Sequence, residues 1–365
     1  MNKSSQILFL WTRISGYMSA CWRKLAEIPD FNIHIIAKRP KVTGDQAPFD
    51  DDVAHGLELT LLSADECSYE AEQRIYEVVI RHAPSVIVVA GWAQPLYNKI
   101  ARNLHANGCR VVMTMDTPWK GTSRQFAALP ILRARLKHVD HVVVASERAW
   151  QYAKRIGFSE ENITRGLYAW DQDMFGGIAD RRPPDGADWP RKFLFVGRYV
   201  PEKGLDVIVE AYKEYRAIVD DPWPLTCCGS GELRSLLHNQ DGIDDAGFVQ
   251  PASLPDILRH HSVFIFPSRY EPWGVALAEA MGTGMPVICS EACGAAVELH
   301  HHLWTGWSVA TGSKASLVDA LFIAHECKQH FPSISRHCVS AAAPTSHVEW
   351  ARRWHNTICR VCSTD

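Results

Sequence analysis

Short apolar runs alternate with longer amphipathic stretches along the chain. In the first half the runs predict strands at 7–10, 32–37, 57–62, 85–90, 110–114 and 141–145. In the second half they predict strands at 193–196, 224–228, 247–249, 264–266, 286–289 and 306–309. Helices are predicted at 21–26, 69–81, 96–106, 254–260, 275–281, 314–325 and 349–361 and from 147 and 205, with a loop at 332–344. Apolar strands alternating with helices predict two α/β halves, each with a parallel sheet covered on both faces.

A change in composition separates the two halves. Residues 168–190 are rich in Gly, Pro and charged side chains, which is typical of a connecting segment. A length of 365 residues also favours two domains. We therefore predict an N-terminal domain over 1–170, a linker over 171–190, a C-terminal domain over 191–345 and a final helix within 346–365.

One predicted helix in the second half carries an isolated charge. Residues 275–281 are apolar except for Glu279, and a helix that is apolar all round is a buried helix. A carboxylate is rarely buried without a partner, so either a cation of the fold or a ligand is expected to meet it. A core helix with one hydrogen-bonded glutamate is the alternative. Glu271 precedes the helix, followed by Trp273 and Gly274.

The loop after the predicted strand 193–196 carries two cations, each beside a glycine. Gly197 precedes Arg198, and Gly204 follows Lys203, just before a helix. Glycines let the backbone approach a ligand, and a helix start adds a partial positive charge. The planar guanidinium of Arg198 and the compact charge of Lys203 suit the binding of a diphosphate. We favour this interpretation over a solvated surface loop that happens to carry two cations.

Polar or aromatic residues follow three predicted strands of the first half. They are Ser15 and Gly16, Gly91 and Trp92, and Asp116. Such strand ends can line one side of a ligand cleft. An ordinary strand-to-helix turn at Gly16 and a cap or turn role for Asp116 stay open as alternatives.

Composition excludes several classes of protein. A formal net charge of −3 gives no electrostatic footprint for nucleic acid. The eleven cysteines follow no repeating frame, which favours reduced thiols in the cytoplasm. No apolar run is long enough for a signal peptide or a membrane span. Adjacent histidines at 260–261 and 300–302 and the Cys359-x-x-Cys362 pair do not complete a metal site.

A predicted helix at 129–138 carries Arg133, Arg135 and Lys137 beside apolar residues. A solvated helix face, which the composition favours, and a basic amphipathic face for an anionic membrane surface both stay open.

With these residues placed, the chain resembles the retaining GT-B glycosyltransferases of family GT4. Glu271 and Glu279 are similar to the E-x7-E pair of that family, and Arg198 with Lys203 is similar to its G-R-x-x-x-x-K-G loop. The segments GSGELRSLL and GFV resemble its nucleotide loop and base-contact segment. The resemblance covers residues 193–324 closely and the first half more loosely. Gly91-Trp92 and the Asp116 segment resemble members of bacterial surface-polysaccharide synthesis.

The resemblance implies two Rossmann-like domains that face a cleft, with the last helix crossing back to the N-terminal domain. It implies a hexosyltransferase-type enzyme that moves a sugar from a nucleotide-diphosphate sugar to a glycan, lipid-linked glycan or small-molecule hydroxyl, without a cofactor or metal. The N-terminal domain would bind the acceptor, with peripheral membrane contact at the inner face as a further expectation.

Individual roles follow from the matched motifs. Arg198 and Lys203 would bind the diphosphate, Glu279 the ribose, and Glu271 the donor sugar. The implied donor-binding set is Gly16, Gly197, Arg198, Lys203, Gly229, Phe248, Val249, Glu271, Trp273, Gly274, Val275 and Glu279, and the implied catalytic set is Arg198, Lys203, Glu271 and Asp116. Many members have a histidine at the strand end where this chain has Asp116, which puts the usual donor-sugar contact there in question.

Three other functions compete with this interpretation. A glycosidase needs two carboxyl groups about 5–9.5 Å apart across the scissile bond, which the Glu271–Glu279 spacing does not favour. An NAD(P) oxidoreductase needs a G-x-G-x-x-G turn, and GSGELR lacks the third glycine. A catalytically silent sugar-nucleotide-binding protein stays open because of Asp116.

Overall fold

A computed structural model describes residues 4–39, 51–63 and 66–363 of the chain. These residues form two compact units. The described residues before Trp170 and those from His347 onward form the first unit, and Trp170–Ser346 form the second. Each unit is described separately below.

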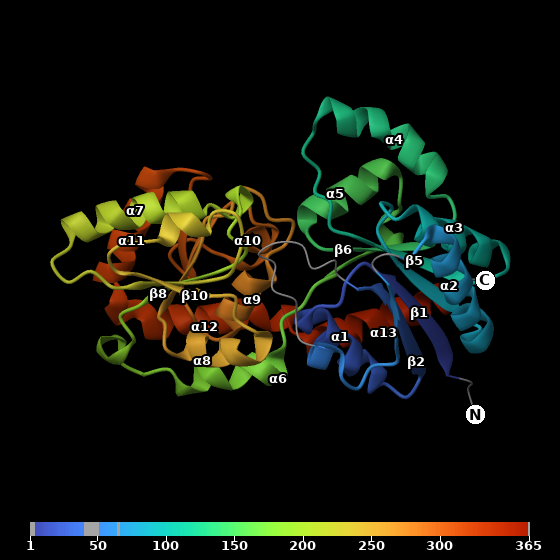
Figure 1. The fold of residues 1–365 in the computed structure, drawn as a ribbon, viewed down its shortest axis with the longest axis horizontal. Helices are drawn as coiled ribbons and strands as arrows, with labels where there is room; N and C mark the ends of the chain where they lie inside the picture. The colour runs from blue at the N-terminus through green and yellow to red at the C-terminus, as the bar shows by residue number, and fades with distance from the viewer. Residues whose placement is uncertain (1–3, 40–50, 64–65, 364–365) are drawn as a thin grey trace. The chain divides into compact units, whose positions relative to one another are not determined.

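The first unit is a parallel sheet with helices on both faces (Figure 1). The strand order is β3-β2-β1-β4-β5-β6-β7. The strands are β1 (Ser5–Trp11), β2 (Phe31–Lys38), β3 (Leu59–Leu62), β4 (Val86–Ala90), β5 (Arg110–Met115), β6 (His141–Val144) and β7 (Ile163–Arg165). The helices are α1 (Gly16–Ala26), α2 (Ser68–His82), α3 (Pro95–Ala106), α4 (Ser123–Arg135), α5 (Glu147–Ile156) and α13 (His347–Ser363).

Strand β1 shows how the apolar runs build the core of this unit. Successive side chains of a strand point to opposite faces of the sheet. Leu8 and Leu10 join the core cluster on the face that α2 and α3 cover. On the other face the Phe9 ring lies 5.9 Å from the ring of Trp22 in α1 and 5.6 Å from that of Trp354 in α13. A strand buried on both faces has no polar alternation, which is the pattern seen in the sequence.

The last helix of the chain belongs to the first unit. Helix α13 packs against α1, and its Trp350 and Trp354 are fully buried with ring centroids 4.9 Å apart. Trp350 Nε1 also donates a hydrogen bond of 2.8 Å to the carbonyl of Leu167. The predicted return of the C-terminal helix to the N-terminal half is therefore confirmed.

The second unit is a six-stranded parallel sheet in the order β10-β9-β8-β11-β12-β13. Its strands are β8 (Phe193–Val196), β9 (Leu225–Cys228), β10 (Ile243–Gly247), β11 (Val263–Phe266), β12 (Val287–Ser290) and β13 (Gly306–Val309). Its helices are α6 (Gln172–Phe175), α7 (Leu205–Ile218), α8 (Leu254–Arg259), α9 (Val275–Gly282), α10 (Gly294–Leu299), α11 (Lys314–Glu326) and α12 (Phe331–Ala342).

Several predicted elements differ from the structure. The segment 332–344, predicted as a loop, is mostly helix α12, because Pro332 occupies the first turn, where its missing N–H costs nothing. Residues Phe331, Ile334, Cys338 and Ala342 then form its buried face. The predicted strand 247–249 begins and ends earlier, as β10. Strand β7 and helix α10 are short and were not predicted.

The segment 171–190 contains α6 and two 3-10 turns, Gly176–Arg181 and Gly186–Asp188, and lies within the second unit. Arg182 anchors this segment by donating hydrogen bonds to the carbonyls of Thr283, His261 and Leu258. Its description as an interdomain linker stays a prediction.

Replacing Trp354 tests the contribution of α13 to the first unit. We expect Trp354→Ala to lower the free energy of unfolding of this unit by about 3–5 kcal/mol, because it removes a fully buried aromatic side chain. Arg352→Ala, on the exposed face of the same helix, is the control and should change stability by less than about 1 kcal/mol. Urea unfolding followed by tryptophan fluorescence measures both, and equal effects would contradict the packing described here.

Candidate functional site

The predicted donor residues gather where the strand order of the second unit reverses. Strand β8 lies between β9 and β11, so the chain leaves it in one direction and returns on the other side at β11. Ligands of open parallel sheets bind at such switch points, outside the carboxyl ends of the strands. The loop after β8 carries Arg198 and Lys203, and the loop after β11 carries Glu271. The structure therefore brings Lys203 and Glu271 together and places Arg198 in the same loop as Lys203.

Two close backbone approaches hold the loops at this edge of the sheet. Gly204 has a φ of +74°, and a Cβ there would lie 2.7 Å from the carbonyl oxygen of Pro267 after β11. Gly229 follows β9, and a Cβ there would lie 1.9 Å from the carbonyl oxygen of Gly197. Only glycine fits at these distances, so the glycines of the motifs serve the packing of neighbouring loops.

Lys203 and Glu271 form an ion pair with each other. Their side chains are 13% and 12% exposed, so the pair is largely removed from water. The Lys203 ammonium also lies 5.5 Å from the centre of the Phe266 ring. By contrast, the Arg198 side chain is exposed and pairs with no described residue. The site thus presents one cation already engaged with a carboxylate and one that is available to a ligand.

The loop after β11 has a second support that the sequence motifs did not point to. Arg269 forms a two-pronged ion pair with Asp206 in α7, with distances of 2.7 and 2.6 Å. Arg269 Nη1 also donates to the carbonyl of Pro201, and the Arg269 amide donates to that of Glu202. The guanidinium lowers the pKa of Asp206 below its ordinary value. Its fork geometry fixes the loop that carries Lys203 against the loop that carries Glu271.

Helix α9 begins at the same edge with a glycine in the left-handed region. Gly274 has a φ of +110°, and a Cβ there would lie 2.7 Å from Sγ of Cys293. The amides of Gly274 and Val275 donate no hydrogen bond within the described part of the chain. Trp273 is buried beside them. Free amides at a helix start attract anions, so this turn complements the two cations.

Glu279 lies in the second turn of α9. It is half-buried, and its carboxyl group forms no hydrogen bond or ion pair with any residue that the structure describes. Burial raises its pKa to about 7, and the nearby Asp171 carboxylate adds to the effect. The alternative of a glutamate satisfied inside the core is therefore wrong. A carboxyl without a protein partner is suited to accept hydrogen bonds from ligand hydroxyls.

Phe248 and Val249 follow the carboxyl end of β10, the edge strand of this sheet. Both are half-buried. They lie on the same edge as Gly229 because β9 and β10 are neighbouring parallel strands. This placement is compatible with their predicted contact to a nucleotide base, which stays a prediction.

In the first unit, three predicted strand ends lie next to one another. Strands β1, β4 and β5 are adjacent and parallel, and they are followed by Gly16, Gly91 and Asp116. Helix α1 begins at Gly16, and the hydroxyl of Ser15 before it is buried without a hydrogen-bond partner in the described chain. Asp116 accepts a hydrogen bond of 3.0 Å from the Tyr168 hydroxyl. Asp116 is not the cap of α4, which is Thr122, so the alternative of a helix cap is wrong, and a turn role stays open.

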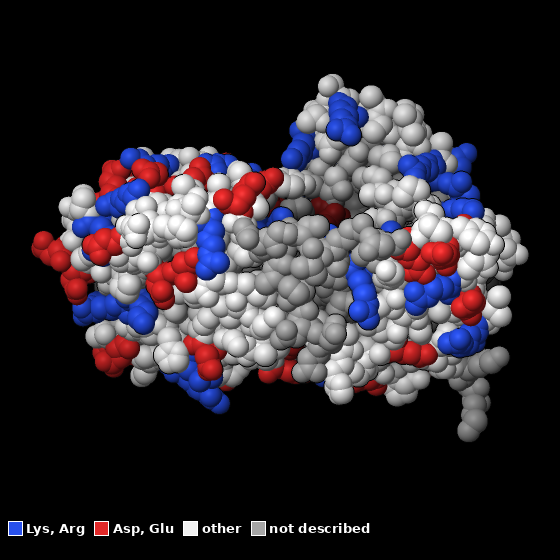
Figure 2. All heavy atoms as spheres, in the orientation of Figure 1, with Lys and Arg blue, Asp and Glu red and all other residues white. Residues whose placement is uncertain are grey.

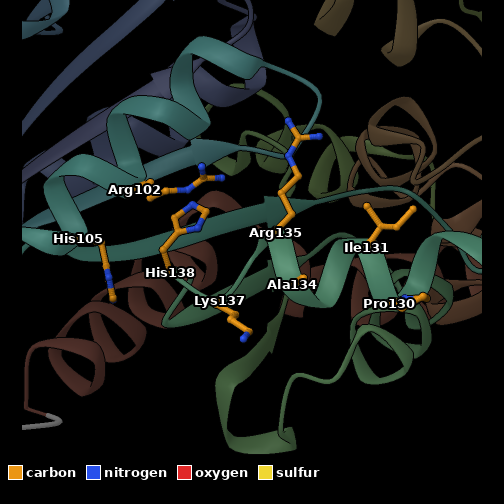
Figure 3. A pocket seen from close by; sticks show the side chains of 8 residues that line it. All are labelled: Arg102, His105, Pro130, Ile131, Ala134, Arg135, Lys137 and His138. Carbon is orange, nitrogen blue, oxygen red and sulfur yellow. The ribbon is translucent and has the colours of Figure 1, made fainter.

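A separate hollow of about 910 Å³ lies between α3 and the end of α4 (Figure 3). Basic and apolar side chains line it together: Arg102, His105, Pro130, Ile131, Ala134, Arg135, Lys137 and His138. The chain has no Asp or Glu between Asp116 and Asp140, and Figure 2 shows Lys and Arg but no acidic atoms on the visible surface over α4. Beside these cations Phe126 and Ile131 are 57% and 66% exposed. We call the surface formed by these basic residues together with Phe126 and Ile131 the α4 basic face.

No helix in the described ranges has both the length and the apolarity needed to cross a bilayer.

Comparison with known sequences identifies the second unit. Residues 179–337 match the family model described as "Glycosyl transferases group 1". An uncharacterized glycosyltransferase of Methanocaldococcus jannaschii is 29% identical over 156 residues, which are 40% of this chain and 40% of the relative. D-rhamnosyltransferase WbpZ of Pseudomonas aeruginosa is 26% identical over 202 residues, which are 53% of this chain and 51% of the relative. The chain thus matches about half, or less, of the length of these curated relatives.

Solved structures show that the fold extends over both units. A sucrose-phosphate synthase from Thermosynechococcus elongatus has a TM-score of 0.74 at 16% identity, with 99% of this chain and 100% of that one covered. Anabaena HepE in complex with UDP and glucose has a TM-score of 0.73 at 16% identity, with 98% and 100% covered. Residues 179–337 thus resemble the group 1 glycosyltransferases, and the chain has the GT-B fold of these solved structures, as the sequence motifs predicted.

The pKa of Glu279 predicts a pH-dependent cost of keeping this residue in the ligand-free fold. Because the folded pKa of about 7 is above the ordinary value of 4.5, the neutral carboxyl favours the folded state below pH 4.5, and this contribution is lost as the pH rises through 7. We therefore expect Glu279→Gln to raise the melting temperature at pH 8 by several degrees and to change it little at pH 4.5.

Thermal denaturation at both pH values measures this effect. Glu326→Gln, an exposed glutamate at the end of α11, is the matched control and should show no such pH dependence. A Glu279→Gln variant that is less stable than the wild type at pH 8 would show that the carboxylate has a protein partner.

Proposed function

We propose that this protein is a retaining glycosyltransferase that moves a sugar from a UDP-sugar to a hydroxyl acceptor without a metal ion. The observation that carries the proposal is the cluster at the switch point of the second unit. Two cations, free amides at the start of α9 and the unpartnered Glu279 lie there within one loop-and-helix system. A nucleoside diphosphate offers the complementary groups, namely two phosphates and a ribose diol.

In this proposal each charged residue has a distinct partner on the donor. Arg198 binds the diphosphate with its free guanidinium, and Lys203 adds a second positive charge. Glu279 accepts hydrogen bonds from the ribose hydroxyls. Glu271 accepts hydrogen bonds from the hydroxyls of the donor sugar. Its ion pair with Lys203 holds the Glu271 carboxylate in position and compensates its charge.

The chemistry requires stabilisation of a departing diphosphate. The bond between the anomeric carbon and the phosphate oxygen breaks, and the acceptor oxygen forms its bond on the same face of the sugar. The acceptor's proton passes to the departing phosphate oxygen, so no separate protein base is needed. Arg198, Lys203 and the α9 amides neutralise the charge that develops on the leaving group, which is the role that a metal would otherwise have.

The nature of the donor is proposed from structures of similar fold. Anabaena HepE was solved with UDP and glucose, and an Escherichia coli trehalose-6-phosphate structure with UDP-2-fluoro glucose has a TM-score of 0.75 at 12% identity. A UDP-sugar is therefore the donor that we propose. In the first unit, we place the acceptor at the carboxyl-end edge of the sheet, beside Gly16 and Asp116. The Asp116–Tyr168 hydrogen bond fixes the carboxylate for this role.

The α4 basic face supports a further element of the proposal, peripheral membrane contact. Arg135 and Lys137 are exposed and pair with no described residue, and Ile131 is 66% exposed between them and the start of the helix. Cations beside exposed apolar side chains bind the headgroup region of anionic bilayers. We therefore propose a cytoplasmic protein that docks on the inner face of a membrane and acts on a lipid-linked or surface glycan.

Replacing Arg198 tests the donor site with little effect on the fold, because its side chain is exposed. We expect Arg198→Ala to lower sugar transfer by about 100-fold or more through lost charge stabilisation. Lys213→Ala, an exposed cation on α7, is the control. A thermal-shift screen of UDP-, GDP- and ADP-sugars supplies the donor for a transfer assay with product detection by mass spectrometry.

Wild-type transfer in Arg198→Ala would refute the diphosphate role. Tight donor binding without transfer to any glycan or lipid acceptor would instead support a silent sugar-nucleotide-binding protein. Lys203→Ala is a weaker test, because it leaves the buried Glu271 carboxylate unpaired and destabilises the loop as well.

Charge reversal on the α4 basic face tests the membrane contact. We expect Arg135→Glu combined with Lys137→Glu to lower binding to vesicles that contain phosphatidylglycerol by about tenfold or more, since each cation contributes about 1 kcal/mol near an anionic surface. Lys213→Glu combined with Lys314→Glu, on the second unit, is the matched control. Vesicle flotation measures both, and equal binding to neutral phosphatidylcholine vesicles would contradict the electrostatic mechanism.

A further inference from the structure

Three side chains from separate segments of the first unit converge away from the proposed donor site. His34 lies in β2, Glu58 precedes β3, and His82 is the last residue of α2. His34 Nδ1 lies 3.2 Å from Glu58 Oε1, and His82 Nε2 lies 3.4 Å from the same oxygen. The two imidazole rings face each other with centroids 4.4 Å apart.

The spacing of these atoms matches the ligand set of a small divalent ion. Zinc binds imidazole nitrogen and carboxylate oxygen at about 2.0–2.2 Å in a tetrahedral arrangement, in which neighbouring ligand atoms lie about 3.3–3.5 Å apart. The two measured distances are 3.2 and 3.4 Å, and the three candidate ligand atoms all lie within 4.8 Å of one another. The two distances to Glu58 therefore match the spacing of ligand atoms around such an ion.

Two of the three candidate ligand atoms form no hydrogen bond with a described residue. His34 Nδ1 and His82 Nε2 are buried, and neither meets the geometry of a hydrogen bond with a described residue. Their close approach to Glu58 is thus not a pair of aligned hydrogen bonds. A buried polar nitrogen without a partner is costly, and a metal ion would satisfy both nitrogens at once.

The second nitrogen of His34 is held as metal-binding histidines usually are. His34 Nε2 lies 2.8 Å from Oγ1 of Thr60 in β3, which fixes the orientation of the ring. His34 is only 6% exposed. The side chain of Glu58 is 49% exposed, which leaves a path for an ion to enter.

The histidines at 260–261 and 300–302 join no such group among the residues described, so the sequence's most visible histidines are not the ones that converge.

We propose that His34 Nδ1, Glu58 Oε1 and His82 Nε2 bind a zinc-class divalent ion, with water completing a tetrahedral site. The site lies toward the amino-terminal side of the sheet, because Glu58 precedes β3 and His82 ends the helix that leads into β4. The proposed acceptor residues follow the opposite, carboxyl ends of the strands. The ion is therefore structural: it ties the edge strand β3 and helix α2 to β2.

Metal titration of the full chain tests this proposal. The exposed thiol of Cys359 lies 3.6 Å from Nε2 of His355 in α13, and Cys362 is a second exposed thiol of this helix. Both would compete for zinc, so the parent protein carries Cys359→Ser and Cys362→Ser. After treatment with a chelator, calorimetry with Zn²⁺ alone is expected to give one site per chain and a rise in melting temperature. Co²⁺ should give the visible spectrum of a tetrahedral site without thiolate charge-transfer bands.

Variants identify the site. Glu58→Gln and His82→Gln should each abolish the tight site, and Thr60→Val should weaken it about 10–100-fold through the ring orientation of His34. His260→Gln, an exposed histidine in the other unit, should leave zinc binding unchanged. Circular dichroism checks that each variant is folded, and Glu58, being half-exposed, is the safest to replace.

Two results would overturn the proposal. One is the absence of a tight zinc site in the parent protein, and the other is a site that survives in Glu58→Gln and His82→Gln. Sugar transfer by the chelated protein distinguishes this proposal from the proposed function, since transfer needs no metal at the donor site and should persist below the melting temperature.

Discussion

The ion pair between Lys203 and Glu271 connects the loops after β8 and β11, which form the proposed donor site. The residues are 68 positions apart in the sequence, and they meet because β8 and β11 are neighbouring parallel strands. Around this pair the Arg269–Asp206 fork and the close approaches at Gly204 and Gly229 fix the loops. A largely buried ion pair adds little stability on its own, but losing one partner would leave an uncompensated charge. We therefore infer that the pair keeps the side chains of Lys203 and Glu271 charged and in place for a ligand.

Glu279 differs from Glu271 in that its carboxyl group is not paired with a cation of the protein. It lies on an apolar helix, has no partner among the described residues, and its pKa is raised to about 7. A residue that costs stability in the ligand-free protein is retained when a ligand compensates it. In the proposed donor complex, the site combines a preformed ion pair, assigned to the sugar, with an uncompensated carboxyl, assigned to the nucleoside.

The first unit gathers polar side chains at two places, and the order of the strands in its sheet explains both. The ends of β1, β4 and β5 place Gly16, Gly91 and Asp116 side by side, while the opposite side of the sheet gathers His34, Glu58 and His82. The proposed acceptor contacts and the proposed metal site are separated because parallel strands present all their carboxyl ends at one edge. The α4 basic face forms a third feature, built by one helix and therefore already visible in the sequence as a basic amphipathic stretch.

The sequence by itself determined most of the strands and helices, the α/β class and the GT4 motifs, and it predicted the residues that we assign to the donor site. These features are local: apolar runs report burial on both faces, and glycines beside cations mark ligand-binding turns. It missed helix α12, because a proline at a helix start resembles a loop. Only the tertiary structure decided that Lys203 pairs with Glu271, that Glu279 has no protein partner, and that three distant residues converge at His34. Such contacts depend on which strands become neighbours, and strand order is a long-range property that no local pattern encodes.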